Sequence, residues 1–416
     1  MASPKMLREA RFLTGATPST AYTAASNAAW AAGTATKMRI QSLDDGGLVR
    51  EVVKDATTQQ RHYSSPAVIT TTRKGSFSLS MFLGAAESDL TANPMATLLS
   101  KILGGIALPL VSRTDACDSS GVHTSTRVFA SGIESSCVVG QGIKVGTRGD
   151  AKGNAEVRRV TALGTDYVDL NMALSAAPAD GDAITFATTV YLDPDTVQYF
   201  DWLLLGHATA DQRQAIGCQA TGLALTGTGI GELPSVNATF SVADWQWVPS
   251  GDRDQLEPTA AAQGNDPPVD RGLMGLFLGD FGVTTRTAFR GGPIDIPNLG
   301  ASFTAIQGYN GRNGIDGWAR VPFADGLTAT LSLHYDEDMP GIYDDLTNGT
   351  AKQLIFQMGH ADQKCAAVDY GRCFVSSDPV PDEIDGLSGI KFGVTATEDT
   401  LATNDLTLSA CRIHFF

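Results

Sequence analysis

KGSFSLSMFL at residues 74–83 and GLTATLSLHYD at residues 326–336 both alternate apolar side chains with serine or threonine. This is the period of a β-strand that buries one face. After each strand the sequence predicts a short amphipathic helix ended by glycine, and then another alternating strand. These following strands lie in GIGELPSVNATFSVAD (229–244) and GLSGIKFGVTATED (386–399). A strand–helix–strand order that occurs twice predicts an internal repeat, and hence two related domains.

Composition narrows the class of protein. The chain has 416 residues, of which 43% are hydrophobic and 18% charged, and it contains 44 glycines. Such a chain can bury more than one core, and its glycine content favours short strands joined by tight turns. The net charge of −15 argues against a protein that grips the phosphate backbone of nucleic acid, because that binding needs lysine and arginine. No secretory signal and no apolar run of about 18 residues is evident, so we expect cytoplasmic synthesis and no membrane insertion.

The region between the first helix and the strand near residue 236 is longer than the repeat requires. It contains four short alternating segments separated by Gly, Asn and Asp, which predict an inserted small β-barrel. These segments are 139–146, 156–163, 167–170 and 180–186. Two other regions have no clear period: the Ala- and Thr-rich N-terminus, interpreted as an arm, and a Pro- and Gly-rich linker before the second repeat.

Motifs for catalysis and metal binding are weak. The acidic run after His334 is best explained as a strand end leading into a helix cap, and Gly227-x-Gly229-x-Gly231 as a turn rather than a phosphate loop. The six cysteines form no C-x-x-C pair, so buried free thiols are expected, with a local Cys365–Cys373 bridge as the weaker alternative. We therefore expect no enzyme activity, no cofactor and no metal site.

Several stretches together resemble the tail tube proteins of long-tailed bacteriophages. They are RKGSFSLSMFL with its helix ending in LGG, AIGCQATG, GELPSVNATFSVADW, DGLTATLSLHYDED, DDLTNGTAKQLIFQMG, GLSGIKFGVTATED and LSACRIHFF. The resemblance implies a β-sandwich or partial barrel with one flanking helix, whose sheet joins those of its neighbours around a channel. Rings of that family usually hold six tube domains, so a duplicated chain implies three chains per ring.

The expected fold is therefore mainly β: two related tube-type β-sandwich or barrel domains, each with a short flanking helix, plus the inserted small β-barrel. The expected boundaries are an N-terminal arm at 1–36, a first tube domain at 37–116 and 190–248, the insertion at 117–189, a linker at 249–270 and a second tube domain at 271–416. We expect the insertion to decorate the outside of the tube and to be dispensable for assembly.

The function implied by the resemblance is structural. Trimeric pseudo-sixfold rings would stack into the tail tube of the virion, assemble in the host cytoplasm, and guide double-stranded DNA into the bacterium without binding it specifically. Further partners would be the tape measure, the terminator, and the baseplate or tip proteins. Two alternatives from other classes stay open: a tail or surface β-module that binds host carbohydrate through the inserted barrel, and an extracellular hydrolase.

The polar face of the repeated strands is the candidate functional surface. Because the apolar face must lie against the helix and core, the hydroxyl face is left for the channel if the sheet closes as a tube. Hydroxyl groups hold water and offer no positive charge to a passing phosphate backbone. The alternative is an ordinary solvated sheet face. The candidate channel-lining residues are Ser76, Ser78, Ser80, Thr328, Thr330 and Ser332.

Overall fold

A computed structural model shows a mainly β chain, as expected, with two α-helices among the residues that it describes. These residues are 9–14, 36–44, 46–48, 52–54, 68–70, 73, 75–84, 94–146, 155–193, 200–206, 212–227, 232–247, 274–285, 287–289, 291–299, 303–312, 315–320, 327–334, 339–360, 364–384, 386–397 and 406–416. The expected linker at 249–270 and the acidic run 336–338 lie outside them. No helix within these ranges is long and apolar enough to cross a membrane.

The first sheet has seven antiparallel strands in the order β2-β1-β15-β16-β17-β6-β3. Its second strand consists of residues 9–14, which the sequence analysis assigned to the N-terminal arm but which pair with β2 on one side and β15 on the other. Sequence analysis missed this strand because its six residues, EARFLT, are too few to reveal an alternation of apolar and polar side chains. The strands are β1 (Glu9–Thr14), β2 (Thr36–Arg39), β3 (Ser42–Asp44), β6 (Gly75–Phe82), β15 (Phe200–Gly206), β16 (Gln212–Thr226) and β17 (Ser235–Trp247).

The second sheet has eleven strands, seven of which form a path β19-β18-β24-β25-β27-β23-β20. Beside this path, β26 pairs with β27, and β7, β14 and β28 extend from β25. The path strands are β18 (Met274–Asp280), β19 (Thr287–Phe289), β20 (Gly291–Asp295), β23 (Leu327–His334), β24 (Lys352–Met358), β25 (Ala366–Val375) and β27 (Leu387–Ala396). The others are β7 (Gly104–Ala107), β14 (Thr188–Leu192), β26 (Val380–Ile384) and β28 (Arg412–Phe415).

The seven-strand paths of the two sheets have the same order. When the strands of each path are ranked by their place in the chain, both read 2-1-5-6-7-4-3. In both, a hairpin lies between the third and fourth strands and a helix between the fourth and fifth. The registers correspond as well: the row Phe200–Cys218–Val242–Gly75 of the first sheet has a counterpart in the second sheet. That counterpart is the row Lys352–Cys373–Ala396–Leu327.

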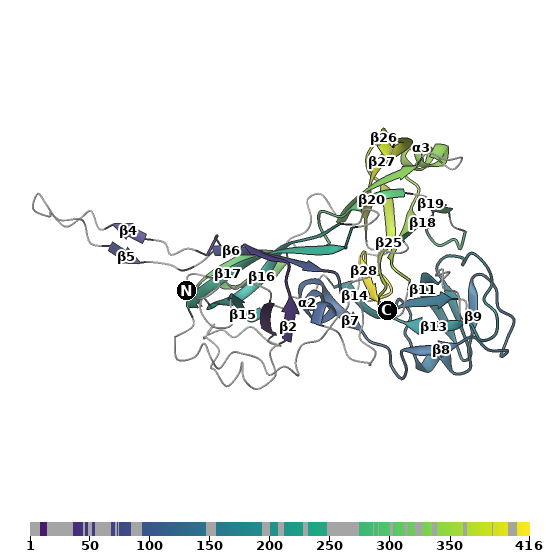
Figure 1. Ribbon diagram of the computed structural model, residues 1–416, viewed down its shortest axis with the longest axis horizontal. Coiled ribbons are helices and arrows are strands. Elements are labelled where there is room, and N and C mark those ends of the chain that lie inside the picture. Colours follow the sequence, from purple (N-terminus) through teal and green to yellow (C-terminus); the bar gives the residue numbers. More distant parts are fainter. Residues whose placement is uncertain are drawn as a thin grey trace, which may run out of the picture.

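The two hairpins lie in different surroundings. The β4–β5 hairpin (Val52–Lys54 and Val68–Thr70) projects from the end of the first sheet (Figure 1). The β21–β22 hairpin (Phe303–Arg312 and Ile315–Arg320) instead packs on the first sheet, where Trp318 Nε1 donates to the carbonyl oxygen of Gly217 at 3.1 Å. A hairpin that leaves the second sheet between β20 and β23 therefore covers part of the first sheet.

One apolar core connects both sheets. Helix α2 (Pro94–Leu103) buries Leu98, Leu99 and Ile102 in it, and Gly104, whose φ is 109°, ends the helix in a conformation that suits glycine. Helix α3 (Met339–Asn348) contributes Ile342. Phe416 is fully buried.

The insertion forms a six-stranded sheet with its own core. Its strands, in the order β8-β13-β10-β11-β12-β9, are β8 (Thr114–Ala116), β9 (Arg127–Phe129), β10 (Gly142–Gly146), β11 (Glu156–Gly164), β12 (Tyr167–Leu170) and β13 (Ala183–Phe186), with the 3-10 turn η1 (Ile133–Ser135). Four of these strands match the alternating segments of the sequence. The flanking strands β7 and β14 join the second sheet, although residues 104–107 and 190–192 were expected in the first tube domain. Figure 1 shows the insertion beside the second sheet, away from the β4–β5 hairpin.

Candidate functional site

Strand β6 has the two faces that its sequence predicts. Phe77, Leu79 and Met81 are buried in the common core, whereas Ser78 and Ser80 are half-buried and Ser76 is exposed on the other face. Neighbouring strands extend this polar face through cross-strand hydrogen bonds. Ser78 Oγ lies 3.3 Å from Thr239 Oγ1, and Ser80 Oγ donates to Gln41 Oε1 at 3.1 Å.

Strand β23 has the same two faces, but its polar face is less exposed than that of β6. Leu331 and Leu333 are buried in the core, and Thr328 and Thr330 are half-buried on the opposite face. Ser332 is only 8% exposed, so it is the least accessible of the six candidate residues. The structure thus places the six residues on the polar faces of two corresponding strands.

Charges on these faces are few. Asp44 pairs with Ser78 in the first sheet, and Asp295 pairs with Thr330 in the second, so an acidic residue occupies the corresponding place in each. Lys391 is exposed and lies opposite Ser332 on β27. Sequence analysis did not include Lys391, which adds a positive charge to this face of the second sheet; Arg372 on β25, two residues from the Phe374 that pairs with Thr395, adds another.

Sequence analysis also missed the contribution of β17. Asn237, Thr239 and Ser241 lie opposite Ser80, Ser78 and Ser76. The alternation in VNATFSVAD, which predicted this strand, could also have identified these three polar residues. They alternate with apolar residues that the structure shows to be buried.

Reactive chemistry is not evident on either face. The described residues contain no group of His, Cys, Asp and Glu that could hold a metal ion. All six cysteines are buried free thiols, as expected, and the Cys365–Cys373 bridge is not formed. Burial raises the pKa of Cys373 and Cys411 to about 12, which keeps both thiols protonated and unreactive at neutral pH.

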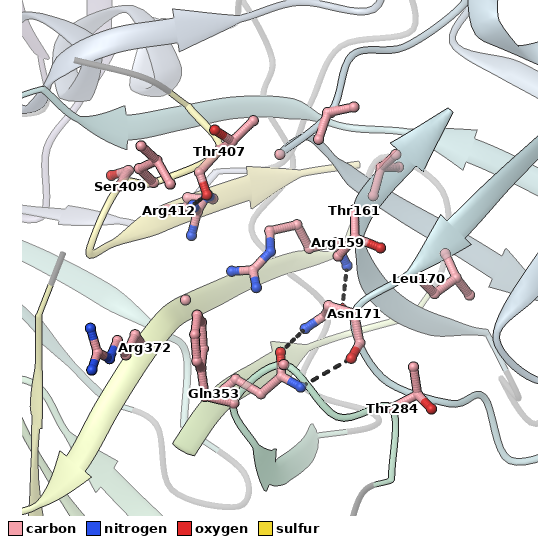
Figure 2. Close-up of a pocket in the computed structure, with 17 residues that line it drawn as sticks. Arg159, Thr161, Leu170, Asn171, Thr284, Gln353, Arg372, Thr407, Ser409 and Arg412 are labelled. Atoms are coloured by element: carbon pink, nitrogen blue, oxygen red, sulfur yellow. Dashed lines mark hydrogen bonds between the residues drawn. The ribbon is translucent and has the colours of Figure 1, made fainter. Parts of the chain in front are cut away.

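A second polar region joins the insertion to the second sheet. Asp369 on β25 is completely buried, and Arg159 from β11 donates to it at 3.1 Å. Arg412 Nη1 and His414 Nε2, both from β28, lie 3.5 and 3.6 Å from the same carboxylate. Three segments that are far apart in the sequence therefore meet at one carboxylate, next to a cavity (Figure 2).

Amide side chains strengthen the same junction. Gln357 accepts from the backbone N–H of Val157 at 2.9 Å and donates to the carbonyl oxygen of Ala155 at 2.9 Å. Asn171 donates to Gln353 Oε1 at 3.0 Å, as Figure 2 shows. The insertion is thus attached to the second sheet by buried hydrogen bonds, which a loosely tethered decoration would lack.

Comparison with known proteins does not assign the chain to a family. No protein-family model matches the chain, and no curated protein matches it either.

Proposed function

We propose that the chain is a structural subunit of a bacteriophage tail tube, built from two tube domains that arose by internal duplication. The observation that carries the proposal is the common strand order 2-1-5-6-7-4-3, with a hairpin and a helix at matching places. Two unrelated sheets of seven strands would rarely share both a non-sequential order and the positions of their insertions. The corresponding registers of the two sheets support the same conclusion.

Contacts between the repeats suggest how tube domains associate. The N–H of Leu225 on β16 donates to the carbonyl oxygen of Ile296 at 2.9 Å, and the N–H of Leu299 donates to that of Leu223 at 2.7 Å. This pairing covers a part of β16 that β15 leaves open. A sheet edge of one repeat is therefore closed by the other, which is the kind of contact that a ring of such domains needs.

The contact between chains would differ from this contact within the chain. The correspondence is found by following the residue pairs across each sheet and matching β6 to β23. By this match, Leu225 corresponds to Pro381 on β26. Proline has no N–H to donate, so this edge cannot repeat the bond from Leu225. Three chains per ring, with six tube domains and alternating kinds of contact, fit a pseudo-sixfold ring better than an exact sixfold one.

The polar sheet faces support a channel for DNA. The six hydroxyl residues of these faces carry no positive charge, and Asp44 and Asp295 lie at corresponding places; Lys391 is the exposed cation that a phosphate backbone would meet on the second sheet. In this proposal the tube belongs to the virion tail, is assembled in the host cytoplasm and meets the tape measure, terminator and baseplate or tip proteins at its ends. It carries out no catalysis.

Polymerisation of the purified chain tests this function. Negative-stain electron microscopy should show hollow tubes after concentration of the protein. A chain that stays monomeric under all conditions, and binds glycans on an array, would instead support the carbohydrate-binding alternative.

A further inference from the structure

The β21–β22 hairpin buries a small part of the first sheet outside the common core. In this part, Ile216 of β16 and Ala243 of β17 are both 0% exposed. Ile315 and Trp318 of β22 form an apolar cluster with them. The indole N–H of Trp318 also donates to the carbonyl oxygen of Gly217, which follows Ile216 in the chain. The first sheet therefore has a surface that is buried by a hairpin from the other half of the chain.

The second sheet has a surface at the corresponding place, which is found from the row of paired residues that matches between the two sheets. Thr397 directly follows this row on β27, just as Ala243 follows it on β17. Arg372 directly precedes the row on β25, just as Gly217 precedes it on β16. The N–H of Thr397 donates to the carbonyl oxygen of Arg372 at 2.9 Å, so these two positions are adjacent. The counterpart of the buried surface therefore lies around Arg372 and Thr397.

This part of the second sheet is partly exposed, whereas the matching part of the first sheet is fully buried. Phe374 of β25 pairs with Thr395 of β27, and both are half-buried, as is Thr397. The guanidinium group of Arg372 lies 5.4 Å from the ring centroid of Phe374 and 5.5 Å from that of Phe281, which is also half-buried. We call these residues the Phe374 surface: Phe281, Arg372, Phe374, Thr395 and Thr397.

A hairpin occupies the same place in both halves of the chain, between the third and fourth strands of the shared order. In the first half it is the β4–β5 hairpin, which projects from the end of the first sheet and lies away from the second sheet of its own chain (Figure 1). An isolated two-stranded hairpin is at best marginally stable in water, so a partner surface would stabilise it. Its strands pair two apolar residues, Val53 and Ile69, which suit burial against such a surface.

We propose that the Phe374 surface binds the β4–β5 hairpin of a second copy of the chain. This docking rests on the proposed function, because it applies the contact between the two repeats of one chain to neighbouring chains. Each tube domain would then cover the domain before it. The second domain covers the first within a chain, and the first domain covers the second domain of the neighbouring chain. Head-to-tail contacts of this kind close into a ring when the rotation between successive units divides a full turn.

Disulfide trapping in the full-length chain tests this contact. All six native cysteines are buried, so introduced cysteines would be the accessible thiols. One double variant combines Val53→Cys with Thr395→Cys, and a second combines Val52→Cys with Thr395→Cys, because neighbouring positions of a strand test its two faces. Val53 pairs with the apolar Ile69, whereas Val52 pairs with Thr70. We therefore expect the first double variant to form the cross-link between chains.

After mild oxidation, a non-reducing gel should show covalently linked chains in the first double variant. They should form at least about tenfold faster than in the second, because docking raises the effective concentration of the thiol on one face of the hairpin. The matched control combines Val53→Cys with Ser120→Cys, at an exposed position of the insertion, and should stay monomeric. Equal cross-linking of the two hairpin variants, or none in either, would overturn the docking.

Electron microscopy of the first double variant separates this contact from the proposed function. Tubes that form without the cross-link would keep the tail-tube function but overturn the docking of the hairpin. Cross-linked chains that never form tubes would support the docking and contradict the tail-tube function.

Discussion

At Asp369, the insertion, the second sheet and the C-terminal strand meet around one buried carboxylate. Burial by itself would raise the pKa of Asp369, but the charges of Arg159 and Arg412 and the nearby imidazole of His414 outweigh it and hold that pKa well below its usual range. The carboxylate therefore stays ionised inside the protein. Burying the charged guanidinium groups of Arg159 and Arg412 costs several kcal/mol, and their attraction to the ionised carboxylate offsets this cost.

Asp369→Asn should lower the free energy of unfolding by about 3–5 kcal/mol, because it removes the buried negative charge that the guanidinium groups of Arg159 and Arg412 share. Urea unfolding followed by circular dichroism measures this change. Asp169→Asn is the control: Asp169 pairs with Arg127 at a more exposed position, so the loss there should stay within about 1 kcal/mol. Similar losses in both variants would show that the buried cluster does not hold the junction together.

His414 should make stability depend on pH. Burial lowers the pKa of His414, and the nearby Asp369 offsets this only in part. Below pH ~6.5 the unfolded chain therefore binds a proton that the folded chain does not, so the free energy of unfolding falls as the pH drops. Between pH 7 and 5 the wild type should lose more stability than His414→Gln. Parallel pH profiles for the two proteins would exclude this role of His414.

None of these partners could be paired from the sequence. Arg159 is 210 positions from Asp369 in the sequence, and strands β26 and β27 lie between Asp369 and Arg412. A buried arginine on a strand looks like a solvated one until the opposing sheet is known. The candidate hydroxyl residues were easier to predict, because their strands alternate regularly. Once the apolar residues of such a strand are assigned to the core, the residues between them must lie on the opposite face.

At the scale of the elements, the insertion is bound to the second sheet more firmly than the sequence suggests. Val157 and Met172 from the insertion share a small apolar cluster with Phe277 and Ile355 of the second sheet. The expectation that the insertion is dispensable came from its separate strand pattern. The structure confirms the pattern but adds this shared cluster and the bonds to Asp369 and Gln357.

Deletion of residues 108–187 should therefore destabilise the chain. Ala107 pairs with Thr189 on adjacent strands, so an inserted Asn-Gly followed by Thr188 gives a three-residue hairpin loop that can join the cut ends. The deletion nevertheless exposes the apolar cluster and removes Arg159, so we expect aggregation or a Tm at least ~10 °C lower. A deleted chain that keeps its Tm and still polymerises would restore the original view of a dispensable decoration.

Lysines on the hydroxyl faces test the proposed channel. Ser78→Lys combined with Thr330→Lys should allow tubes to form but slow the ejection of DNA from assembled particles, most strongly at low salt, because each ring would then attract phosphate groups. Thr114→Lys with Ser120→Lys, at exposed positions of the insertion, is the control and should leave ejection unchanged. Normal ejection from particles that contain the first pair would place these strands outside the channel.

At the scale of the whole molecule, the long strands could be predicted from the sequence and the short strands that connect the two sheets could not. The strands β6, β17, β23 and β27 were predicted because each alternates over many residues and buries one face. The short strands β1, β7 and β14 were not predicted, and β7 and β14 carry the chain between the first sheet and the second. A strand of four or five residues such as GGIA or TTVYL has no period of its own, so only the pairing partner identifies it.

Symmetry is the property of the whole molecule on which the proposed function depends. If the two repeats are related tube domains, then one chain supplies two of the six positions in a ring. The two kinds of domain contact, one within the chain and one between chains, would alternate around it.

Cryo-electron microscopy of tubes assembled from the purified chain measures this directly. The account predicts hollow tubes in which each layer holds three chains, with the two sheets alternating around the channel and the strands of Ser78 and Thr330 facing the lumen. Layers of six chains, or a tube in which only one of the two sheets reaches the channel, would contradict it.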